Sequence, residues 1–351
     1  MALEKADASG IRWLDPREAP FRITGLKWIS SDKVYRRLPV KPDWEIRKAV
    51  DSLANSTAGA QIHFQTDSEK ILVRVWLPRR SGMYHMPATG QSGFDLYVGP
   101  PGELQYRSTT RFDAGASKYE VTLLDESKQN RNVVLNFPLY NGVQKVQVGL
   151  VAGCSLTAPP AFDSEGPIVV YGTSITQGGC AARPGMAYSN ILSRRLNLEF
   201  VNLGFSGNGK GEPELAKLIN QIDNKKMVVL DYEANVSEDI RNTLENFIDI
   251  LRFQNPRMPI LVMSKILYSR ETSGSNDARA RQDRAEFQRR LVETKRSAGD
   301  QNIFFLDGST LLGEHAYECT VDGVHPTDLG FLKMANTMEP VIKKILANAS
   351  E

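Results

Sequence analysis

The sequence contains few cysteines and no long apolar run. Only three of its 351 residues are cysteines, Cys154, Cys180 and Cys319. So small and odd a number provides neither a disulfide framework nor a zinc cluster of cysteines, and it leaves at least one thiol free unless two chains pair. No apolar run reaches the roughly 18 residues that a membrane-spanning helix needs. Internal repeats and low-complexity segments are not evident either. These absences exclude a small disulfide-stabilised protein, a helical membrane protein and a repeat array.

The charge of the chain is nearly balanced, with 43 Lys and Arg residues against 41 Asp and Glu residues and a formal net charge of +2. This balance gives no electrostatic reason to expect nucleic acid or an anionic membrane as a partner. With 41% hydrophobic and 24% charged residues, the composition is that of a globular protein and excludes a disordered chain.

The first ten residues carry Glu4, Lys5 and Asp7 and contain no apolar segment, so they do not resemble a signal peptide. Localisation stays open at this point. We expect a periplasmic or secreted protein if a signal peptide was removed, and a cytoplasmic protein otherwise.

The first half of the chain, residues 1–157, shows mostly the period-two pattern of β-strands from about Val34 to Val151. Ile71, Val73 and Val75 alternate with other residues, and the same alternation recurs over residues 119–123 and 146–150. Short alternating runs broken by Gly, Pro, Asn and Asp indicate antiparallel strands. We therefore expect a β-sandwich with a jelly-roll-like topology in this half.

Two segments of turn-forming residues stand out. Asn141-Gly142 predicts a tight hairpin turn between residues 132–140 and 143–150, because Asn and Gly accept the positive φ angles of that turn. Residues 158–166 are rich in Pro, Ser and Gly and predict a linker between two domains.

Residues 167–351 have a different pattern, in which short apolar runs alternate with segments of helical spacing. Five such strand–helix units predict a parallel sheet covered by helices on both faces, and reactive groups in such folds gather at the carboxyl ends of the strands. The predicted strands are 168–171, 200–203, 227–230, 260–263 and 303–306, and examples of the predicted helices are 186–196, 238–253 and 278–298.

The loops after the first and last predicted strands carry the residues of a serine nucleophile system. Ser174 follows a strand directly and opens a helix, which would expose its hydroxyl at the edge of the sheet. Taken on its own, Ser174 is more readily explained as an N-cap serine. Asp322 lies three residues before His325, a spacing that lets the carboxylate hold the imidazole while the imidazole accepts a proton from a serine hydroxyl. On its own this pair is equally a turn before a helix that begins at Pro326.

Two further loops offer hydrogen-bond donors. Gly207 follows the second predicted strand and Asn235 follows the third. A glycine lets a backbone N–H approach a substrate oxygen, and an asparagine amide can donate from the side. Each of these residues alone has a plain structural explanation. Together, however, four strand ends carry a serine, hydrogen-bond donors and an acid–histidine pair, and this combination predicts an active site.

These loops resemble the sequence blocks of the SGNH (GDSL-type) hydrolases, an esterase superfamily with a flavodoxin-like sheet. Thr173 stands where this family usually has Asp, and of the family's Gly-x-Asn-Asp block only Asn235 is kept. The matching segments are Gly172-Thr173-Ser174-Ile175-Thr176-Gln177-Gly178, Ser206-Gly207-Asn208, Glu233-Ala234-Asn235-Val236 and Asp322-Gly323-Val324-His325-Pro326.

The resemblance implies a role for each matched residue. Ser174 would be the nucleophile, His325 the base and Asp322 the acid that orients it. The backbone N–H groups of Ser174 and Gly207 and the amide of Asn235 would form the oxyanion hole. The segment Gly93-Phe94-Asp95-Leu96-Tyr97 also resembles the Gly-x-Asp-Leu-Tyr signature of a β-domain that precedes one branch of the superfamily. The resemblance thus covers nearly the whole chain.

Several residues near these motifs can be interpreted either as functional or as structural. Glu233, where the family has glycine, either binds a substrate hydroxyl or faces solvent, and we expect it to point away from the acyl oxygen, with Arg183 as a candidate partner. Arg183 is also a tentative substrate-binding residue, though a loop arginine is commonly solvated. Cys180 is expected to be a small buried hydrophobe rather than a second nucleophile. The loop 81–92, which carries His85, is either an ordinary loop or a cover over the site.

A helix is predicted to carry a solvated face of arginines with acids between them. These arginines are Arg279, Arg281, Arg284, Arg289 and Arg290.

The predicted function is that of a serine esterase that needs no metal or organic cofactor. The resemblance implies a short acyl group, acetyl above all, on a carbohydrate or other small-molecule alcohol. The alternatives are a thioesterase or lysophospholipase with the same triad, a sugar acetyltransferase, and a non-catalytic glycan-binding protein with a decayed esterase domain. Whether the chain forms a homo-oligomer stays open.

Overall fold

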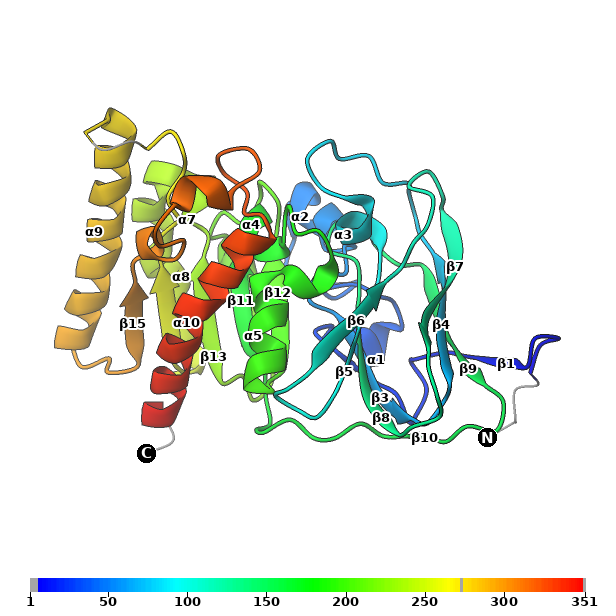
Figure 1. Ribbon diagram of the computed structural model, residues 1–351. Helices are drawn as coiled ribbons and strands as arrows, with labels where there is room; N and C mark the ends of the chain where they lie inside the picture. The colour runs from blue at the N-terminus through cyan, green and yellow to red at the C-terminus, as the bar shows by residue number, and fades with distance from the viewer. Residues whose placement is uncertain (1–5, 272–273, 350–351) are drawn as a thin grey trace.

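The computed structural model describes residues 6–271 and 274–349. A β-rich half and an α/β half lie side by side, and the chain passes once from the first to the second (Figure 1). Among the described residues, no helix combines the length and the apolar character needed to cross a membrane.

The first half consists of two antiparallel sheets. One has four strands in the order β1-β9-β4-β7, and the other has the order β10-β3-β8-β5-β6 with β2 also paired to β3. Two short helices, α1 (Ile29–Asp32) and α2 (Lys48–Leu53), lie between β2 and β3 of the same sheet, and a third, α3 (Ala88–Ser92), lies in the connection from β4 of one sheet to β5 of the other. The strands are β1 (Ile11–Leu14), β2 (Arg22–Thr24), β3 (Gln61–Thr66), β4 (Lys70–Trp76), β5 (Asp95–Val98), β6 (Gln105–Thr109), β7 (Lys118–Asp125), β8 (Arg131–Asn136), β9 (Lys145–Val151) and β10 (Leu156–Thr157).

Alternate residues of these strands fill the space between the two sheets. On β4 the side chains of Ile71, Val73 and Val75 are fully buried and pack in one cluster with Ile62 and Phe64 of β3. The period-two pattern of the sequence therefore marks the inward face, as a half-buried strand requires. The expected antiparallel β-domain is confirmed.

The expected hairpin at Asn141-Gly142 is wrong. The strand before it, β8, belongs to the six-stranded sheet, and the strand after it, β9, belongs to the four-stranded sheet. The segment is a buried crossover, in which the Asn141 amide donates to the carbonyl of Arg79 and to the Ser92 hydroxyl. The Asn-Gly pair serves a close approach here, since a Cβ on Gly142 would lie 2.5 Å from the carbonyl oxygen of Asn55.

The second half is built on a five-stranded parallel sheet in the order β12-β11-β13-β14-β15. This is the flavodoxin-like order, whose strand order reverses beside the first strand and opens a site at the carboxyl ends. All five strands coincide closely with the predicted ones: β11 (Ile168–Gly172), β12 (Phe200–Gly204), β13 (Met227–Asp231), β14 (Ile260–Met263) and β15 (Ile303–Leu306).

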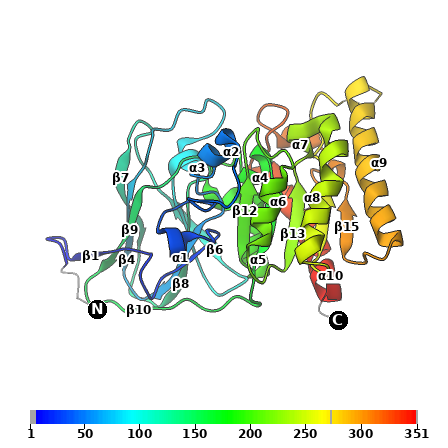
Figure 2. The same ribbon diagram turned by 180° about the vertical axis from the view of Figure 1, so that it is seen from behind.

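Helices cover both faces of this sheet, and the two faces have separate cores (Figures 1 and 2). Val170 of β11 packs with Ile191 of α5 and Phe331 of α10. Val169 of the same strand packs on the other face with helices α6 and α8. The helices are α4 (Ser174–Gln177), α5 (Tyr188–Leu196), α6 (Pro213–Asn220), α7 (Glu233–Val236), α8 (Ile240–Gln254), α9 (Asn276–Ser297) and α10 (Asp328–Ala349), with 3₁₀ turns η1 (Pro184–Met186), η2 (Ser237–Asp239), η3 (Gly308–Thr310) and η4 (Ala316–Cys319).

The two halves share buried contacts. Arg37 lies fully buried, and its guanidinium donates to the carbonyls of Asn202 and Gly204 at the end of β12. Burial lowers the pKa of Arg37 to about 9. Leu139 of the first half packs into the core of the second. These buried contacts therefore hold the β-domain against the carboxyl edge of the parallel sheet.

Candidate active site

The strand–helix turn after β11 presents the predicted nucleophile. Thr173 caps α4 through a capping box, in which its hydroxyl accepts from the N–H of Ile175 and its own N–H donates to the Thr176 hydroxyl. Ser174 thus occupies the first helical position rather than the cap. Gly172 has no room for a side chain, since a Cβ would lie 2.0 Å from the Thr176 hydroxyl and 2.4 Å from the Asp231 carbonyl oxygen.

A buried carboxylate braces this turn from the third strand. Asp231, the last residue of β13, accepts hydrogen bonds on Oδ2 from the Thr176 hydroxyl at 2.7 Å and the Tyr188 hydroxyl at 2.8 Å. Burial raises the pKa of Asp231 to about 7, against the effect of these two bonds, and the charge of Glu233 adds to the rise. The nucleophile turn therefore rests on a group that titrates near neutral pH.

The loop before α10 folds into a narrow turn that holds the predicted acid and base. The Val321 N–H donates to the His325 carbonyl at 2.9 Å and closes the turn. Gly323 has a φ of +84°, and a Cβ there would lie 2.2 Å from the Ser269 hydroxyl. Asp322 and His325 are therefore brought together by a loop that needs glycine at its tip.

The structure brings Ser174, His325 and Asp322 into one hydrogen-bonded chain. Ser174 Oγ lies 2.9 Å from His325 Nε2, and His325 Nδ1 lies 2.7 Å from Asp322 Oδ2. The other oxygen of Asp322 accepts from the N–H groups of His325 and Val324. Partial burial disfavours the charged carboxylate, but these hydrogen bonds outweigh it and lower the pKa of Asp322. An ionised Asp322 accepts a hydrogen bond from Nδ1–H, which keeps the proton on Nδ1 and leaves the Nε2 lone pair facing the serine.

The predicted oxyanion donors lie on the neighbouring loops. Gly207 has a φ of +67° and open space where a Cβ would stand. The amide of Asn235 donates one hydrogen bond to the Phe205 carbonyl at 3.3 Å. This bond ties the third loop to the glycine loop and uses one of the two N–H groups of the amide.

The structure does not place Glu233 where it could bind substrate. Its side chain is fully buried and accepts hydrogen bonds from Arg284 Nε at 3.0 Å, Gln288 Nε2 at 2.8 Å and the Lys265 N–H at 2.9 Å. Its partners are therefore neither Arg183 nor solvent. A buried carboxylate needs such compensation, and α9 supplies it.

Arg183 is likewise engaged elsewhere. Its guanidinium donates to Asp95 Oδ2 at 3.0 Å and to the Tyr97 hydroxyl, and it stacks on the ring of Tyr106 at 3.8 Å. Asp95 is fully buried and also accepts from the Gly185 N–H at 2.7 Å. The Gly-x-Asp-Leu-Tyr segment thus clamps the loop that follows the nucleophile helix, and the tentative substrate role of Arg183 does not fit this placement.

Sequence patterns missed part of this arrangement. The α9 arginines were expected on a solvated face, but Arg281 and Arg284 are both buried. Arg281 lies 3.7 Å from Glu271, and Arg284 bridges Glu233 and Glu238. The two arginines are three residues apart, which places them on the same side of the helix. This spacing is the sequence feature that could have indicated that both face a common partner.

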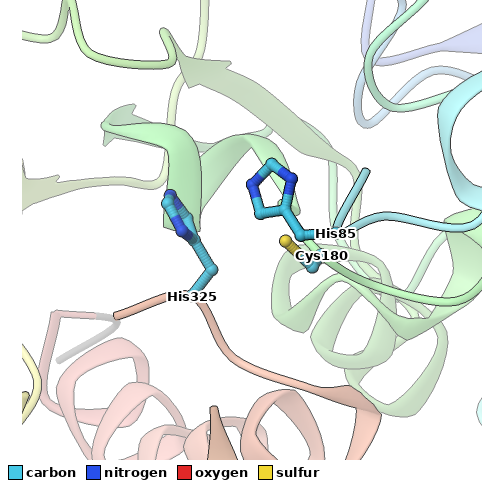
Figure 3. Close-up of side chains that lie close together, drawn as sticks. All are labelled: His85, Cys180 and His325. Carbon is cyan, nitrogen blue, oxygen red and sulfur yellow. The ribbon is translucent and has the colours of Figure 1, made fainter. Parts of the chain in front are cut away.

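The β-domain also reaches the site directly. The ring of His85 lies 5.5 Å from the ring of His325, edge to face, and Figure 3 shows Cys180 below the His85 ring. The Tyr140 hydroxyl donates to the Ser174 carbonyl at 3.2 Å. Cys180 is buried, as expected, and burial together with the charge of Asp322 raises the pKa of its thiol to about 12. The loop 81–92 therefore forms one wall of the site.

An open pocket of about 690 Å³ lies against His85 and Cys180. Its lining is largely apolar and comes from both halves of the chain. The lining residues are Tyr84, His85, Met86, Pro87, Cys180, Ala182, Val321, Thr327, Asp328 and Leu329.

Comparison with known proteins agrees with this architecture. The model of the GDSL-like lipase/acylhydrolase family matches residues 165–343, more than half of the chain, and the chain therefore belongs to that family. The model of the N-terminus of SGNH-hydrolase-type esterases, named for its Gly-x-Asp-Leu-Tyr motif, matches residues 11–156. Both the recognition of the family and the predicted fold class are confirmed. No curated protein sequence matches the chain significantly.

Several solved structures have the same fold over nearly the full length. A protein of Bacteroides ovatus described as a GDSL-like lipase is 29% identical, with a TM-score of 0.85 over 96% of this chain and 98% of its own. The salicylyl-acyltransferase SsfX3 of a tetracycline biosynthetic pathway is 22% identical, with a TM-score of 0.78 over 97% and 98%. A family two carbohydrate esterase of Cellvibrio japonicus is 14% identical, with a TM-score of 0.60 over 97% and 99%. At the identities of the last two, the likeness shows the fold alone.

Proposed function

We propose that this protein is a serine esterase that hydrolyses short acyl esters, acetyl esters above all, on carbohydrate alcohols. The observation that carries the proposal is the hydrogen-bonded chain from Ser174 Oγ through His325 to Asp322. A hydroxyl, an imidazole and a carboxylate in this order are the arrangement that activates a serine.

In the proposed reaction, Ser174 Oγ attacks the ester carbonyl carbon while His325 Nε2 accepts its proton. The carbonyl oxygen becomes an oxyanion, which the N–H groups of Ser174 and Gly207 and the amide of Asn235 stabilise. His325 returns the proton to the leaving alcohol, and an acyl-Ser174 intermediate remains. Water then attacks this intermediate with His325 again as the base, which releases the acid and regenerates the serine.

Two features support a carbohydrate alcohol. Tyr84, at the rim of the pocket, is 93% exposed and stacks on His85 with ring centroids 4.4 Å apart, so its outer face is free to stack against a sugar ring. Carbohydrate esterases also occur among the proteins of the same fold, and one from Clostridium thermocellum was solved with cellohexaose. That enzyme is 16% identical to this chain, so its ligand supports the proposal by analogy only.

The test is hydrolysis of p-nitrophenyl acetate and of acetylated oligosaccharides by the wild type and by Ser174→Ala. We expect the wild type to release acetate from both and the variant to lose several orders of magnitude in kcat. Equal and negligible rates for both proteins would refute the esterase and favour a glycan-binding role.

The same assay separates the remaining alternatives. A series of p-nitrophenyl esters from acetate to octanoate, with an acyl thioester alongside, distinguishes an acetylesterase from a lysophospholipase or thioesterase. Mass spectrometry with a free oligosaccharide as acceptor detects a transferase, because acetyl groups would then appear on the added sugar instead of as acetate.

A further inference from the structure

Three side chains from separate segments converge beside the proposed nucleophile. His85 comes from the β-domain loop, Cys180 from the segment after α4, and His325 from the loop before α10. One ring nitrogen of each histidine and the sulfur of Cys180 all lie within 4.8 Å of one another (Figure 3).

The proposed reaction uses neither His85 nor Cys180. Cys180 is buried in the wall of the pocket. His85 Nδ1 is buried and has no hydrogen-bond partner in the part of the chain that the structure describes. Such a nitrogen costs free energy unless a ligand satisfies it.

Two imidazoles and a thiol are the ligand set that zinc favours. Zinc binds histidine nitrogen at about 2.0–2.1 Å and thiolate sulfur at about 2.3 Å, which places two nitrogens and a sulfur that share one tetrahedral ion about 3.3–3.6 Å apart. The three groups, now within 4.8 Å, therefore need to close by at most about 1.5 Å, within the reach of side-chain rotation of His85 in the irregular segment between β4 and α3. The open pocket gives the ion a path, and water or the Ser174 hydroxyl completes four-coordination.

The geometry points to a zinc site: we propose that His85, Cys180 and His325 bind Zn²⁺, and that the ion inhibits the enzyme. The Cys180 thiol gives its proton to solvent as the sulfur–zinc bond forms, and the dipositive ion replaces the proton in stabilising the sulfur. The ion takes the Nε2 lone pair of His325, because Nδ1 is held by Asp322. His325 then cannot accept the Ser174 proton. The inhibition rests on the proposed esterase function, whereas the binding does not.

The experiment measures binding and activity separately on the full chain. The protein is treated with a chelator, dialysed and titrated with Zn²⁺ by calorimetry. It is also titrated with Co²⁺, whose thiolate charge-transfer absorption in the near ultraviolet reports a sulfur ligand. Hydrolysis of p-nitrophenyl acetate is followed against free Zn²⁺, each protein relative to its own chelator-treated rate. The variants are His85→Ala and Cys180→Ser, with His315→Ala and Cys154→Ser as matched controls outside the cluster.

We expect one Zn²⁺ per chain, inhibition that a chelator reverses, and a cobalt–thiolate band. Loss of a group that only supports a metal ligand commonly weakens binding 10- to 100-fold, so loss of His85 or Cys180 should weaken binding at least tenfold. Cys180→Ser should also abolish the band, while His315→Ala and Cys154→Ser behave as the wild type.

Equal zinc affinity in His85→Ala and the wild type would overturn the site, as would a thiolate band that survives in Cys180→Ser or disappears in Cys154→Ser. If Cys180→Ser does not fold, His85→Ala decides the question alone. Zinc binding without any esterase activity would refute the proposed function and leave the metal site standing. Esterase activity without zinc binding would refute the metal site and leave the proposed function standing.

Discussion

Replacing Glu233 by glutamine tests whether this buried carboxylate is a brace or a substrate ligand. Its Oε1 accepts from Arg284, and its Oε2 accepts from Gln288 and the Lys265 N–H. A glutamine that keeps its oxygen at the Oε2 position turns its NH₂ group toward the Arg284 Nε–H, so two donors face each other. Removing one partner of a buried ion pair costs about 3–5 kcal/mol. Arg284 keeps its second partner, Glu238, at 2.9 Å, so we expect the lower end, about 3 kcal/mol.

The assay is urea denaturation at neutral pH together with steady-state kinetics on p-nitrophenyl acetate and an acetylated sugar. Glu233→Gln should lower the free energy of unfolding by that amount and affect the two substrates equally, because the side chain touches neither. The control is Glu238→Gln, whose side chain is 61% exposed and pairs with the same arginine. We expect it to cost less than about 1 kcal/mol. A raised KM for the sugar ester alone, with unchanged unfolding, would refute the brace and restore a substrate role for Glu233.

Three further outcomes are expected. His325→Ala should lower kcat by several orders of magnitude with little change in Tm. His315→Ala should stay active, because the His315 ring bonds only to Tyr317 in the described structure. Loss of activity in His315→Ala and not in His325→Ala would show that the wrong histidine was chosen. Asn235→Ala should lower kcat about 10²–10³-fold with a small change in KM, and an unchanged kcat would remove it from the oxyanion hole. Asp231 binds its proton more tightly when folded, with a pKa near 7 against the ordinary 3.8, so its contribution to stability falls by up to about 1.4 kcal/mol per pH unit between about pH 4 and 7. Asp231→Asn can keep its carbonyl oxygen at the Oδ2 position, and its free energy of unfolding should lose this dependence on pH. If the free energies of unfolding of the wild type and the variant instead changed with pH in parallel, the raised pKa of Asp231 would be contradicted.

The strands and the ends of the parallel sheet were predictable because their signals are local. Each of the five apolar runs is long enough for one buried strand, and the observed strands begin and end within a residue of the predicted ones. The resemblance to the esterase superfamily rests on short blocks at these strand ends, and the folded chain brings Ser174, Asp322 and His325 into hydrogen-bond contact. Their catalytic roles stay predictions that the kinetic experiments test.

Other features were not predictable in this way. Asn141-Gly142 has the composition of a hairpin turn, but its flanking strands pair with partners in different sheets. Arg183 lies in a loop and Glu233 opens the short helix α7, positions where polar residues are commonly exposed. Each nevertheless meets a partner on a distant segment: Asp95 in the β-domain and Arg284 on α9. Only contacts across the fold decide whether such a residue faces substrate or supports the structure.

The sequence by itself determined the two-part fold, the five-stranded sheet and the four loops that carry the candidate chemistry, because hydrophobic periodicity and turn chemistry act over a few residues. The tertiary structure alone decided which side chains share the site. It placed His85 of the β-domain 5.5 Å from His325, and it buried Glu233 under α9. These partners are separated by tens to hundreds of residues. The first pair meets because the two halves pack together, and the second because α9 packs over the third loop of the parallel sheet, and no local pattern records either contact.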